Sequence, residues 1–287
     1  MNSGNGQPRR LAIFGDPVRQ SRSPRMYNAL FERMGYNAVY SAIEVRAEEL
    51  RGALDAMRAL HLAGGHLTCP HKEAAVALLD ELTPAAARAG AVNVVACRGG
   101  RLIGDNTDGA GFLVALKKEF GHDIGHRAAI LGAGGSARAI AFALADDGFD
   151  EITVLNRTFA RAASLAAALS AAGVKARALP LSPEAFAEIA PHLDLSIDAT
   201  TPGPDNPVDA LPVEGLPEAA ICCDINYFRP SAPWILRASE AGHRTQGGLG
   251  MLVEQGALSL RLLLDMEVEG ETLADSLQPA QPSLAAP

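Results

Sequence analysis

The sequence is poor in aromatic residues and lacks an excess of positive charge, and each shortage narrows what the chain can be. Phe, Trp and Tyr make up only 5% of the residues, so Ala, Leu and Val must fill the core, which favours helices packed on sheets. The formal net charge is −8, whereas a nucleic acid or an anionic membrane would call for a basic face. A small anionic ligand remains compatible with this charge, because one Lys or Arg can dominate within a cleft.

The cysteines and the apolar segments show no sign of a metal site, an export signal or a membrane anchor. Cys69, Cys97, Cys222 and Cys223 form no C-x-x-C pair and no metal spacing with histidine, so we interpret them as reduced thiols and expect no metal. The first ten residues contain no apolar signal segment. No apolar run approaches the roughly 20 residues that span a bilayer. The sequence therefore predicts a cytoplasmic protein without a nucleic-acid or membrane partner.

Strand and helix patterns alternate along the 287 residues, a length that suits two domains of ordinary size. The first helix should begin at about Pro24, with Ser23 as its N-cap. The predicted strands are 10–14, 38–45, 65–68, 91–96, 128–131, 152–155, 177–179, 195–199 and 221–225. The other predicted helices are 47–60, 71–82, 110–120, 137–145, 160–171, 183–189 and 249–266. This alternation predicts βαβ units, and hence an α/β fold with mainly parallel sheets.

A glycine-rich turn lies between a predicted strand and a predicted helix, which is the context of a dinucleotide site. It contains Gly132, Gly134 and Gly135, followed by the small Ala137 where a third glycine is usual. Glycines let the backbone approach a pyrophosphate, and the helix N-terminus adds free N–H groups and positive partial charge. We predict that 132–137, including Ala133 and Ser136, bind a nicotinamide dinucleotide. A tight turn that binds nothing is the alternative.

The residues after the next predicted strand favour NADP over NAD. An NAD site has Asp or Glu there, about 20 residues beyond the turn, to bind the ribose 2′-hydroxyl. Here Asn156, Arg157 and Thr158 occupy that place, with Arg161 one helical turn later, and no acid is present. A guanidinium can clamp a 2′-phosphate with paired hydrogen bonds and stack on the adenine. An ordinary solvated pair of arginines is the alternative.

These patterns predict two domains of different function. Residues 109–247 would form a Rossmann-type NADP-binding domain around the glycine turn. Residues 1–108 would form an α/β substrate-binding domain, together with about 248–278. The helix at 249–266 is apolar on one side, and we expect it to pack back on this first domain. Residues 279–287, rich in Pro and Ala, would form a disordered tail.

A lysine and an aspartate precede the nucleotide turn. Lys72 ends the run 66–72, and Asp108 follows Asn106 and Thr107. Hydride transfer to a ketone leaves an alkoxide that needs a proton, and the reverse reaction needs a base. A lysine can serve both directions when burial lowers its pKa toward neutrality, and an aspartate can orient its ammonium. From these residue types alone, ordinary solvated surface charges are the more common case.

Ordered motifs along nearly the whole chain resemble the shikimate dehydrogenase family. They are Gly15-Asp16-Pro17 with Ser21-Arg22-Ser23-Pro24 and Asn28, Thr68-Cys69-Pro70-His71-Lys72, Gly90-Ala91-Val92-Asn93, Gly104-Asp105-Asn106-Thr107-Asp108-Gly109, Gly132–Gly135, Asn156-Arg157-Thr158, Asp224-x-x-Tyr227, and 248–255. Several matches in a fixed order are far more specific than a lone glycine loop.

The resemblance implies reversible, NADP-dependent reduction of 3-dehydroshikimate to shikimate, an oxidoreductase reaction of aromatic amino-acid biosynthesis through chorismate. By motif, Lys72 would be the acid/base residue and Asp108 its partner. Either a monomer or a homodimer is expected.

The resemblance also assigns ligand-binding residues in both predicted domains. Ser21 and Ser23 would bind the substrate carboxylate by hydroxyl donation. Ring hydroxyls would be held by Thr68, Asn93 and Gln255. Tyr227 would close the pocket near the nicotinamide, and Gly248 and Met251 would belong to the cofactor site.

Three positions depart from the family pattern. His66 stands where the lysine motif begins with asparagine, Val94 replaces a common threonine, and Asp198 replaces an asparagine near the nucleotide turn, where an inward carboxylate would disfavour a phosphate. His66 could also be a packed strand residue with one satisfied nitrogen. The departures leave Lys72 and Asp108 intact and bear on which ring acid is bound. A quinate or quinate/shikimate dehydrogenase, using NADP or NAD, is therefore the runner-up. An enzyme for a related cyclitol acid and a non-catalytic NADPH-binding regulator come after it.

Overall fold

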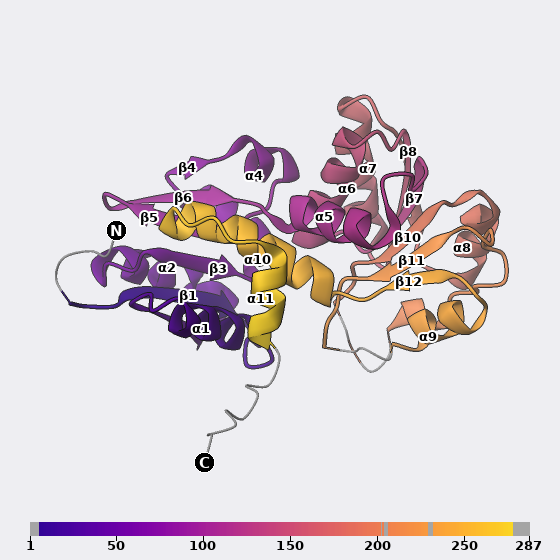
Figure 1. Ribbon diagram of the computed structural model, residues 1–287. Helices are drawn as coiled ribbons and strands as arrows, with labels where there is room; N and C mark the ends of the chain where they lie inside the picture. Colours follow the sequence, from indigo (N-terminus) through magenta and orange to yellow (C-terminus); the bar gives the residue numbers. More distant parts are fainter. Residues whose placement is uncertain (1–5, 202, 204–205, 229–231, 278–287) are drawn as a thin grey trace, which may run out of the picture.

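The computed structural model describes residues 6–201, 203, 206–228 and 232–277, which form two units, each built on a sheet (Figure 1). The first sheet has six strands in the order β2-β1-β3-β5-β6-β4. Its strands are β1 (Arg9–Gly15), β2 (Ala38–Glu44), β3 (Gly64–Leu67), β4 (Glu81–Leu82), β5 (Val94–Arg98) and β6 (Arg101–Asp105). β1 pairs in parallel with β2 and β3, whereas β5 runs antiparallel to β3 and β6.

The antiparallel pair arises from a glycine hairpin. Gly99 and Gly100 join β5 to β6 with φ of 57° and 79°, values that glycine adopts without steric penalty and that two-residue hairpins require. The sequence analysis missed β6 and began the preceding strand at 91 instead of Val94.

Alternating side chains of β1 face two helical layers. Leu11 and Ile13 pack with α1 (Ser23–Arg33), whereas Ala12 and Phe14 pack with α2 (Leu50–Ala59). Helix α1 has Arg22 as its N-cap, so the prediction that Ser23 caps it was wrong, and Ser23 is the first helical residue.

The predicted helix at 71–82 was also wrong, because the chain changes conformation three times within it. It comprises α3 (His71–Ala74), the 3₁₀ helix η2 (Ala75–Leu78) and the strand β4, which pairs with β6. Helix α4 (Pro84–Ala89) then begins with the Thr83 side chain accepting a hydrogen bond from the N–H of Ala86. Strand pairing and this cap therefore outweigh the helical pattern that the apolar residues suggested.

The second sheet is parallel throughout its six strands, in the order β12-β11-β10-β7-β8-β9. Its strands are β7 (Arg127–Leu131), β8 (Glu151–Asn156), β9 (Lys175–Pro180), β10 (Leu195–Asp198), β11 (Ile221–Asp224) and β12 (Arg244–Gln246), and its helices are α5 (Asp108–Phe120), α6 (Gly135–Asp146), α7 (Phe159–Ala171), α8 (Pro183–Ile189) and α9 (Pro233–Glu240). The strand order reverses at β7. In open parallel sheets, ligands bind outside the carboxyl ends of the strands at such a switch point.

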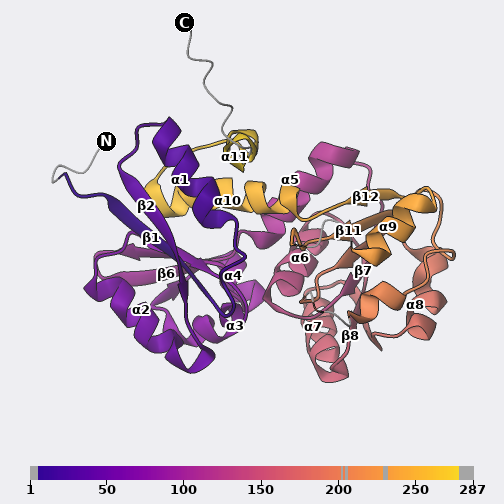
Figure 2. The same cartoon turned by 90° about the horizontal axis from the view of Figure 1, so that it is seen from below.

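Helix α10 (Leu249–Leu264) leaves the second unit and returns to the first (Figures 1 and 2). Its Leu252, Val253 and Leu260 belong to the same core cluster as Leu11 and Met26 of the first sheet and α1. Helix α11 (Gly270–Leu277) then lies on α1 and α10. The α/β fold with mainly parallel sheets is therefore confirmed, and this packing supports our proposal that about 248–278 belong with 1–108 as one domain and 109–247 form the other.

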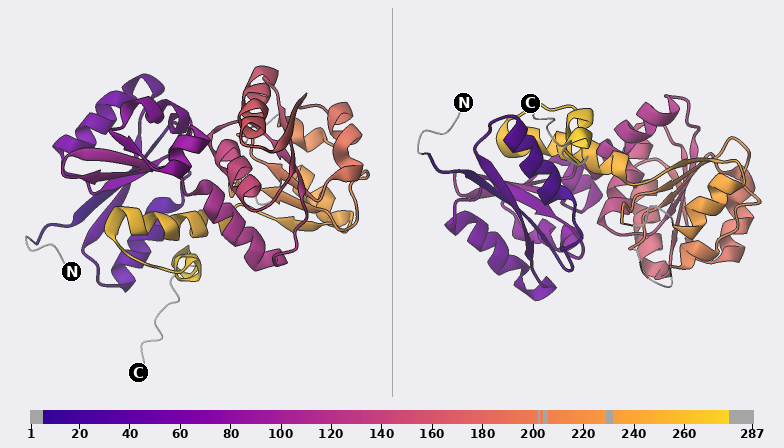
Figure 3. Two further views of the ribbon diagram at one scale, coloured as in Figure 1. Left: turned by 90° about the horizontal axis from the view of Figure 1, so that it is seen from above. Right: turned by 60° about the horizontal axis from the view of Figure 1, so that its bottom comes forward.

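Helices α5 and α10 lie at the junction of the two units (Figure 3). They approach closely because of Gly111, where a Cβ would lie 2.5 Å from the backbone nitrogen of Gln255. The contact therefore fixes Gln255 beside the start of α5. No helix among the described residues is both long and apolar enough to cross a membrane. The predicted tail at 279–287 lies outside the described residues.

Candidate active site

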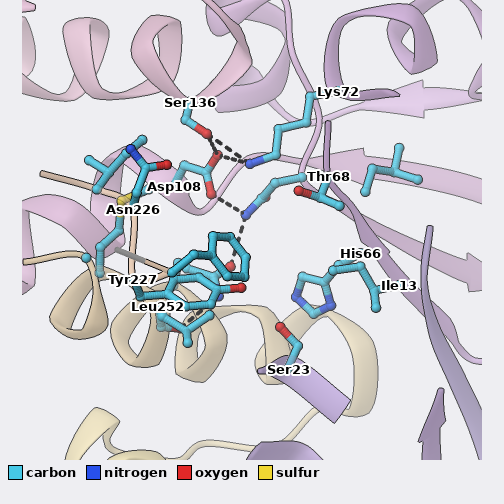
Figure 4. Close-up of a pocket in the computed structure, with 17 residues that line it drawn as sticks. Ile13, Ser23, His66, Thr68, Lys72, Asp108, Ser136, Asn226, Tyr227 and Leu252 are labelled. Carbon is cyan, nitrogen blue, oxygen red and sulfur yellow. Dashed lines mark hydrogen bonds and ion pairs between the residues drawn. The ribbon is translucent and has the colours of Figure 1, made fainter. Parts of the chain in front are cut away.

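A cavity of about 160 Å³ lies between the two units, near the carboxyl ends of β3 and β11 (Figure 4). Its lining combines residues of both units with residues of α10. The polar and aromatic members of the lining are Ser23, His66, Thr68, Lys72, Asn93, Asp108, Ser136, Asn226, Tyr227, Phe228 and Gln255. The cavity thus brings together the predicted lysine, the predicted aspartate and most of the predicted substrate-binding residues.

Lys72, Asp108 and Ser136 form a triangle of hydrogen bonds on one wall of the cavity (Figure 4). Lys72 Nζ lies 2.6 Å from Asp108 Oδ2 and 3.0 Å from Ser136 Oγ, and Ser136 Oγ donates to the same carboxylate oxygen at 3.0 Å. The Lys72 and Asp108 side chains are only 16% and 5% exposed. Asp108 is the first residue of α5, where the helix dipole favours a negative charge. The sequence placed Ser136 in the cofactor turn and gave no sign that it also contacts this pair.

The Asn93 amide holds the carboxylate oxygen of Asp108 that Lys72 does not contact. Its Oδ1 accepts from the backbone N–H of Thr107, and its Nδ2 lies 2.9 Å from Asp108 Oδ1. The same nitrogen also lies 2.9 Å from Thr107 Oγ1 and 3.1 Å from Gln255 Oε1. Because an amide nitrogen carries two hydrogens, these three acceptors already exceed its capacity. A ring hydroxyl that accepts a hydrogen from this nitrogen would have to replace one of them, whereas one that donates would meet Asn93 Oδ1.

Gln255 and Thr68 retain free capacity toward the cavity. Gln255 Nε2 donates one hydrogen to the carbonyl of Leu252 at 2.8 Å and keeps the second. Thr68 follows β3 and lines the cavity beside His66. Both side chains can therefore meet a polar ligand, whereas their binding of ring hydroxyls stays a prediction.

His66 is buried between two tyrosines. Its Nδ1 lies 2.7 Å from the Tyr40 hydroxyl, and its Nε2 lies 3.3 Å from the Tyr27 hydroxyl. Burial lowers the pKa of His66 to about 3, so the ring is neutral. The sequence pointed to His66 but not to the tyrosines, because α1, β2 and β3 bring the three residues together from distant positions.

Tyr227 closes one side of the cavity, next to the start of α1. Burial raises the pKa of the Tyr227 phenol, and hydrogen bonds to the Ser21 side chain and the Arg22 backbone partly oppose this rise. The centroids of the Tyr227 and Phe228 rings lie 4.1 Å apart, and the Arg22 guanidinium carbon lies 5.8 Å from the centroid of the Tyr227 ring. Ser23 lines the cavity, whereas Ser21, which contacts Tyr227, is outside the lining.

The glycine turn has the geometry of a phosphate cradle at the switch point of the second sheet. Gly132 has φ of 116°, and a Cβ there would lie 2.6 Å from the carbonyl oxygen of Ala199. A Cβ on Gly134 would meet nothing within 4 Å, so the crest of the turn is open. Ala137 is fully buried in the core below. The turn therefore leaves room at the N-terminus of α6 for a phosphate.

Gly135 brings this turn against Lys72. A Cβ on Gly135 would lie 2.8 Å from Lys72 Cβ and 3.3 Å from Ala91 Cβ. The nucleotide turn and the Lys72 wall are thus in direct contact, which is the arrangement that a reaction between a cofactor and a substrate needs.

The segment after β8 carries the predicted 2′-phosphate residues. Asn156 Nδ2 donates to the carbonyl of Thr158, which is the N-cap of α7, and Arg157 is exposed. Arg161 donates to the carbonyl of Ala133 at 3.1 Å and pairs with Glu73 of the other unit. The Arg161 guanidinium thus lies beside the glycine turn, and no acid directly follows β8.

Asp198, the extra carboxylate near the turn, is engaged by its own loop. It accepts from the Thr200 N–H at 2.9 Å, from Thr200 Oγ1 at 2.6 Å and from Asn206 Nδ2 at 3.2 Å. Burial raises its pKa, and these bonds oppose the rise. The concern that Asp198 points at a cofactor phosphate is therefore not supported.

Gly248 and Met251 lie where α10 begins and both line the cavity. A Cβ on Gly248, the N-cap of α10, would lie 2.0 Å from the carbonyl oxygen of Ile225. The start of α10 is thus fixed against the end of β11, which positions Met251 between the two units.

Two sequence families match this chain. The family described as "Shikimate dehydrogenase substrate binding domain" matches residues 13–95, and the family described as "Shikimate / quinate 5-dehydrogenase" matches residues 115–203. The shikimate dehydrogenase (NADP(+)) of Methanopyrus kandleri is 41% identical over 273 residues, which cover 93% of this chain and 94% of that protein.

Solved structures agree with these matches. Shikimate 5-dehydrogenase from Thermus thermophilus, in complex with NADP(H) and shikimate, is 39% identical with a TM-score of 0.81, covering 94% of this chain and 98% of the other. Quinate dehydrogenase from Corynebacterium glutamicum, in complex with NAD, is 26% identical with a TM-score of 0.82, covering 94% and 99%.

Proposed function

The chain belongs to the shikimate dehydrogenase family, and from this premise we propose that it interconverts 3-dehydroshikimate and shikimate with NADP as the cofactor. The observation that carries the proposal is the triangle of Lys72, Asp108 and Ser136 on the wall of a cavity that also adjoins the glycine turn. A proton donor, a carboxylate and a nucleotide cradle thus meet at one place.

Lys72 is the proton-transfer residue in this proposal. During reduction, the ammonium of Lys72 protonates the alkoxide that forms at the former ketone, and during oxidation the neutral amine accepts the hydroxyl proton. Asp108 orients Nζ through the 2.6 Å contact and can accept a bond from a neighbouring ring hydroxyl. Asn93 and the N-terminus of α5 keep the Asp108 carboxylate in place.

The remaining polar residues of the cavity suit a polyhydroxy ring acid. Ser23 would donate its hydroxyl hydrogen to the carboxylate, and Thr68, Asn93 and Gln255 would hold ring hydroxyls. Ser21, which contacts Tyr227 outside the cavity lining, would reach the carboxylate only by leaving that contact. Tyr227 would cover the ring on the side of the second unit. Neutral donors and acceptors of this kind orient a small polar ligand without excess charge.

The second unit fits NADP. The open crest at Gly134 and the N-terminus of α6 can accept a pyrophosphate, and Arg157 and Arg161 can meet a 2′-phosphate. When bound, the cofactor supplies the hydride to the ketone carbon. Residues 132–137, Asn156, Thr158, Gly248 and Met251 would form the rest of its site.

The test is kcat/KM for shikimate and for quinate, each with NADP and with NAD. Shikimate with NADP should give the highest value. A dominant value for quinate would favour the runner-up, which the C. glutamicum quinate dehydrogenase makes a natural alternative. Saturable NADPH binding without turnover on any ring acid would instead indicate a regulator.

A lysine that forms an ion pair far from the cavity, Lys175, provides the control for the role of Lys72. Lys72→Ala should lower kcat at least about 100-fold, the scale of general acid–base catalysis, while NADPH binding persists. Lys175, which pairs with Glu151 at 2.9 Å where β9 and β8 begin, lies at the opposite end of the second sheet. Lys175→Ala should leave kcat unchanged. Near-normal turnover by Lys72→Ala would exclude Lys72 as the proton-transfer residue.

A cytoplasmic location and a monomeric or homodimeric state are part of the same proposal and follow from the sequence. Size-exclusion chromatography with light scattering measures the second, and fractionation of the source cells measures the first.

A further inference from the structure

Two of the three departures from the family pattern are neighbours in the first sheet. In the strand register, His66 of β3 lies beside Ile13 of β1 and beside Val94 of β5. Side chains that are paired across strands point to the same face of a sheet. Ile13, His66 and Val94 therefore form one row, which we call the central row. His66 and Ile13 of this row line the cavity, and Val94 is fully buried beside them.

The hydrogen-bonding capacity of His66 is used within the protein. The Tyr27 hydroxyl donates its only hydrogen to the carbonyl of Gly256 at 3.0 Å, so it must accept from His66 Nε2. His66 Nε2 therefore carries the proton. Because the ring is neutral, Nδ1 is an acceptor and receives the hydrogen of the Tyr40 hydroxyl at 2.7 Å.

This arrangement leaves only carbon on the surface that His66 gives to the cavity. Both ring nitrogens have buried partners, and Tyr27 and Tyr40 are no more than 2% exposed. Ile13 adds aliphatic carbon to the lining on one side of His66, and the buried Val94 packs beside His66 on the other side. The part of the central row that faces the cavity is thus an apolar floor, opposite to the polar wall that Lys72, Asp108 and Ser136 form.

The apolar floor lies next to Ser23. Ser23 is four residues before Tyr27 on α1, which places both side chains on the same helix face, and Tyr27 contacts His66. Figure 4 shows Ser23 and His66 as neighbours at the same end of the cavity. Under the proposed function, on which this inference rests, Ser23 binds the substrate carboxylate, so the floor faces the ring carbon that bears the carboxylate.

We propose that His66, fixed by Tyr27 and Tyr40, is a specificity-determining residue that selects ring acids without a hydroxyl on the carboxylate-bearing carbon. Shikimate has a trigonal carbon there and no hydroxyl. Quinate has a tetrahedral carbon with a hydroxyl, which would be buried against the central row without a partner. A buried hydroxyl without a partner lowers binding roughly 10- to 100-fold, so quinate is disfavoured by about that factor.

The test compares quinate with shikimate in three variants. His66→Asn shortens the side chain and introduces an amide with more donor and acceptor positions than the two tyrosines can use, so the ratio of kcat/KM for quinate to that for shikimate should rise roughly 10- to 100-fold. Val94→Thr adds one hydroxyl beside His66 and should raise the ratio in the same direction but less. His66→Leu combined with Tyr40→Phe keeps the floor apolar without freeing the Tyr40 hydroxyl, so it should keep the wild-type ratio and serves as the matched control.

The ratio is informative because a general loss of stability lowers both activities together. Binding of shikimate and quinate, measured by thermal shift in the presence of NADP, gives the same comparison without turnover. An unchanged ratio in both His66→Asn and Val94→Thr would overturn the inference, as would a wild-type enzyme that prefers quinate. If His66→Asn fails to fold, Val94→Thr decides alone. A wild-type protein that oxidises neither acid would overturn the proposed function first.

Discussion

Because His66 is buried, we expect the stability of the protein to fall in acid. The ordinary pKa of His66 is 6.5, and burial lowers it to about 3 in the folded chain. Between these values the unfolded chain binds a proton that the folded chain excludes, so the free energy of unfolding must fall as the pH falls below about 6.5. The stability is fully present above this pH, and the loss levels off near pH 3.

The size of the effect follows from the shift. Each pH unit within this window costs about 1.4 kcal/mol, so at pH 4.5 the native state should have lost about 3 kcal/mol through His66 alone. In His66→Asn this contribution disappears. The difference in unfolding free energy between wild type and variant should therefore shift by about 3 kcal/mol in favour of the variant between pH 7 and pH 4.5.

The difference in unfolding free energy between the wild type and His66→Asn reports on His66 alone. Other titrating groups are common to both, and the lost bonds to Tyr27 and Tyr40 add a contribution that does not depend on pH. Urea unfolding can be followed separately in the two units, because the single tryptophan, Trp234, packs in a core cluster of the second unit, whereas Tyr27, Tyr36 and Tyr40 pack in the first. The pH-dependent difference should appear in the tyrosine signal.

A flat difference from pH 7 to pH 4.5 would refute the reasoning. It would mean that His66 titrates near its ordinary pKa in the folded chain, which requires water or a negative charge to reach the ring. The assignment of Nε2–H would then fail as well, because it depends on a neutral imidazole.

Three further predictions concern the cofactor side of the site. Gly135→Ala should lower kcat about 10-fold or more by pushing the turn away from Lys72. Gly134→Ala, whose Cβ would face open space, should chiefly raise the KM for NADP. Steady-state assays in which Gly134→Ala lowers kcat and Gly135→Ala only raises the KM would contradict this geometry. Arg157→Ala should weaken NADP binding at least about 10-fold and leave NAD binding unchanged, and an equal loss in fluorescence titrations would show that Arg157 does not read the 2′-phosphate. Asp198→Asn should cost about 1–3 kcal/mol in unfolding free energy without altering the NADP to NAD preference, and an altered preference would mean that its carboxylate reaches the cofactor.

The sequence predicted the central strands of the second unit better than those of the first, although it missed α9 and β12. In the parallel sheet, strands such as β7 and β8 contain buried, largely apolar runs separated by helices, so local pattern and tertiary structure agree. In the first sheet, the antiparallel β5 and β6 depend on a two-glycine hairpin, and β4 has only two residues. Its pairing with β6 is a long-range contact that the helical pattern of 71–82 does not reveal.

The site could be predicted as far as it lies within contiguous motifs. Lys72 and Asp108 each belong to a short run of characteristic residues, and the cavity contains both. The contact of Ser136 with this pair depends on how the two units approach through Gly135, which no local pattern encodes. Tyr27 and Tyr40 were missed because they reach His66 from different elements, and a tyrosine in an apolar segment is most simply read as core.

The departures at His66, Val94 and Asp198 differ in their effect on the cavity because the three side chains have different surroundings. Asp198 replaces one polar side chain with another, and its oxygens are taken up by Thr200 and Asn206, so the change is contained within a loop. His66 and Val94 leave fewer free hydrogen-bonding groups at and beside the cavity than the asparagine and threonine of the family pattern. Both ring nitrogens of His66 are hydrogen-bonded to tyrosines, and the side chain of Val94 has no polar atom. A sequence comparison weighs these three substitutions alike, whereas the structure places His66 in the lining of the cavity, Val94 beside it and Asp198 within its own loop.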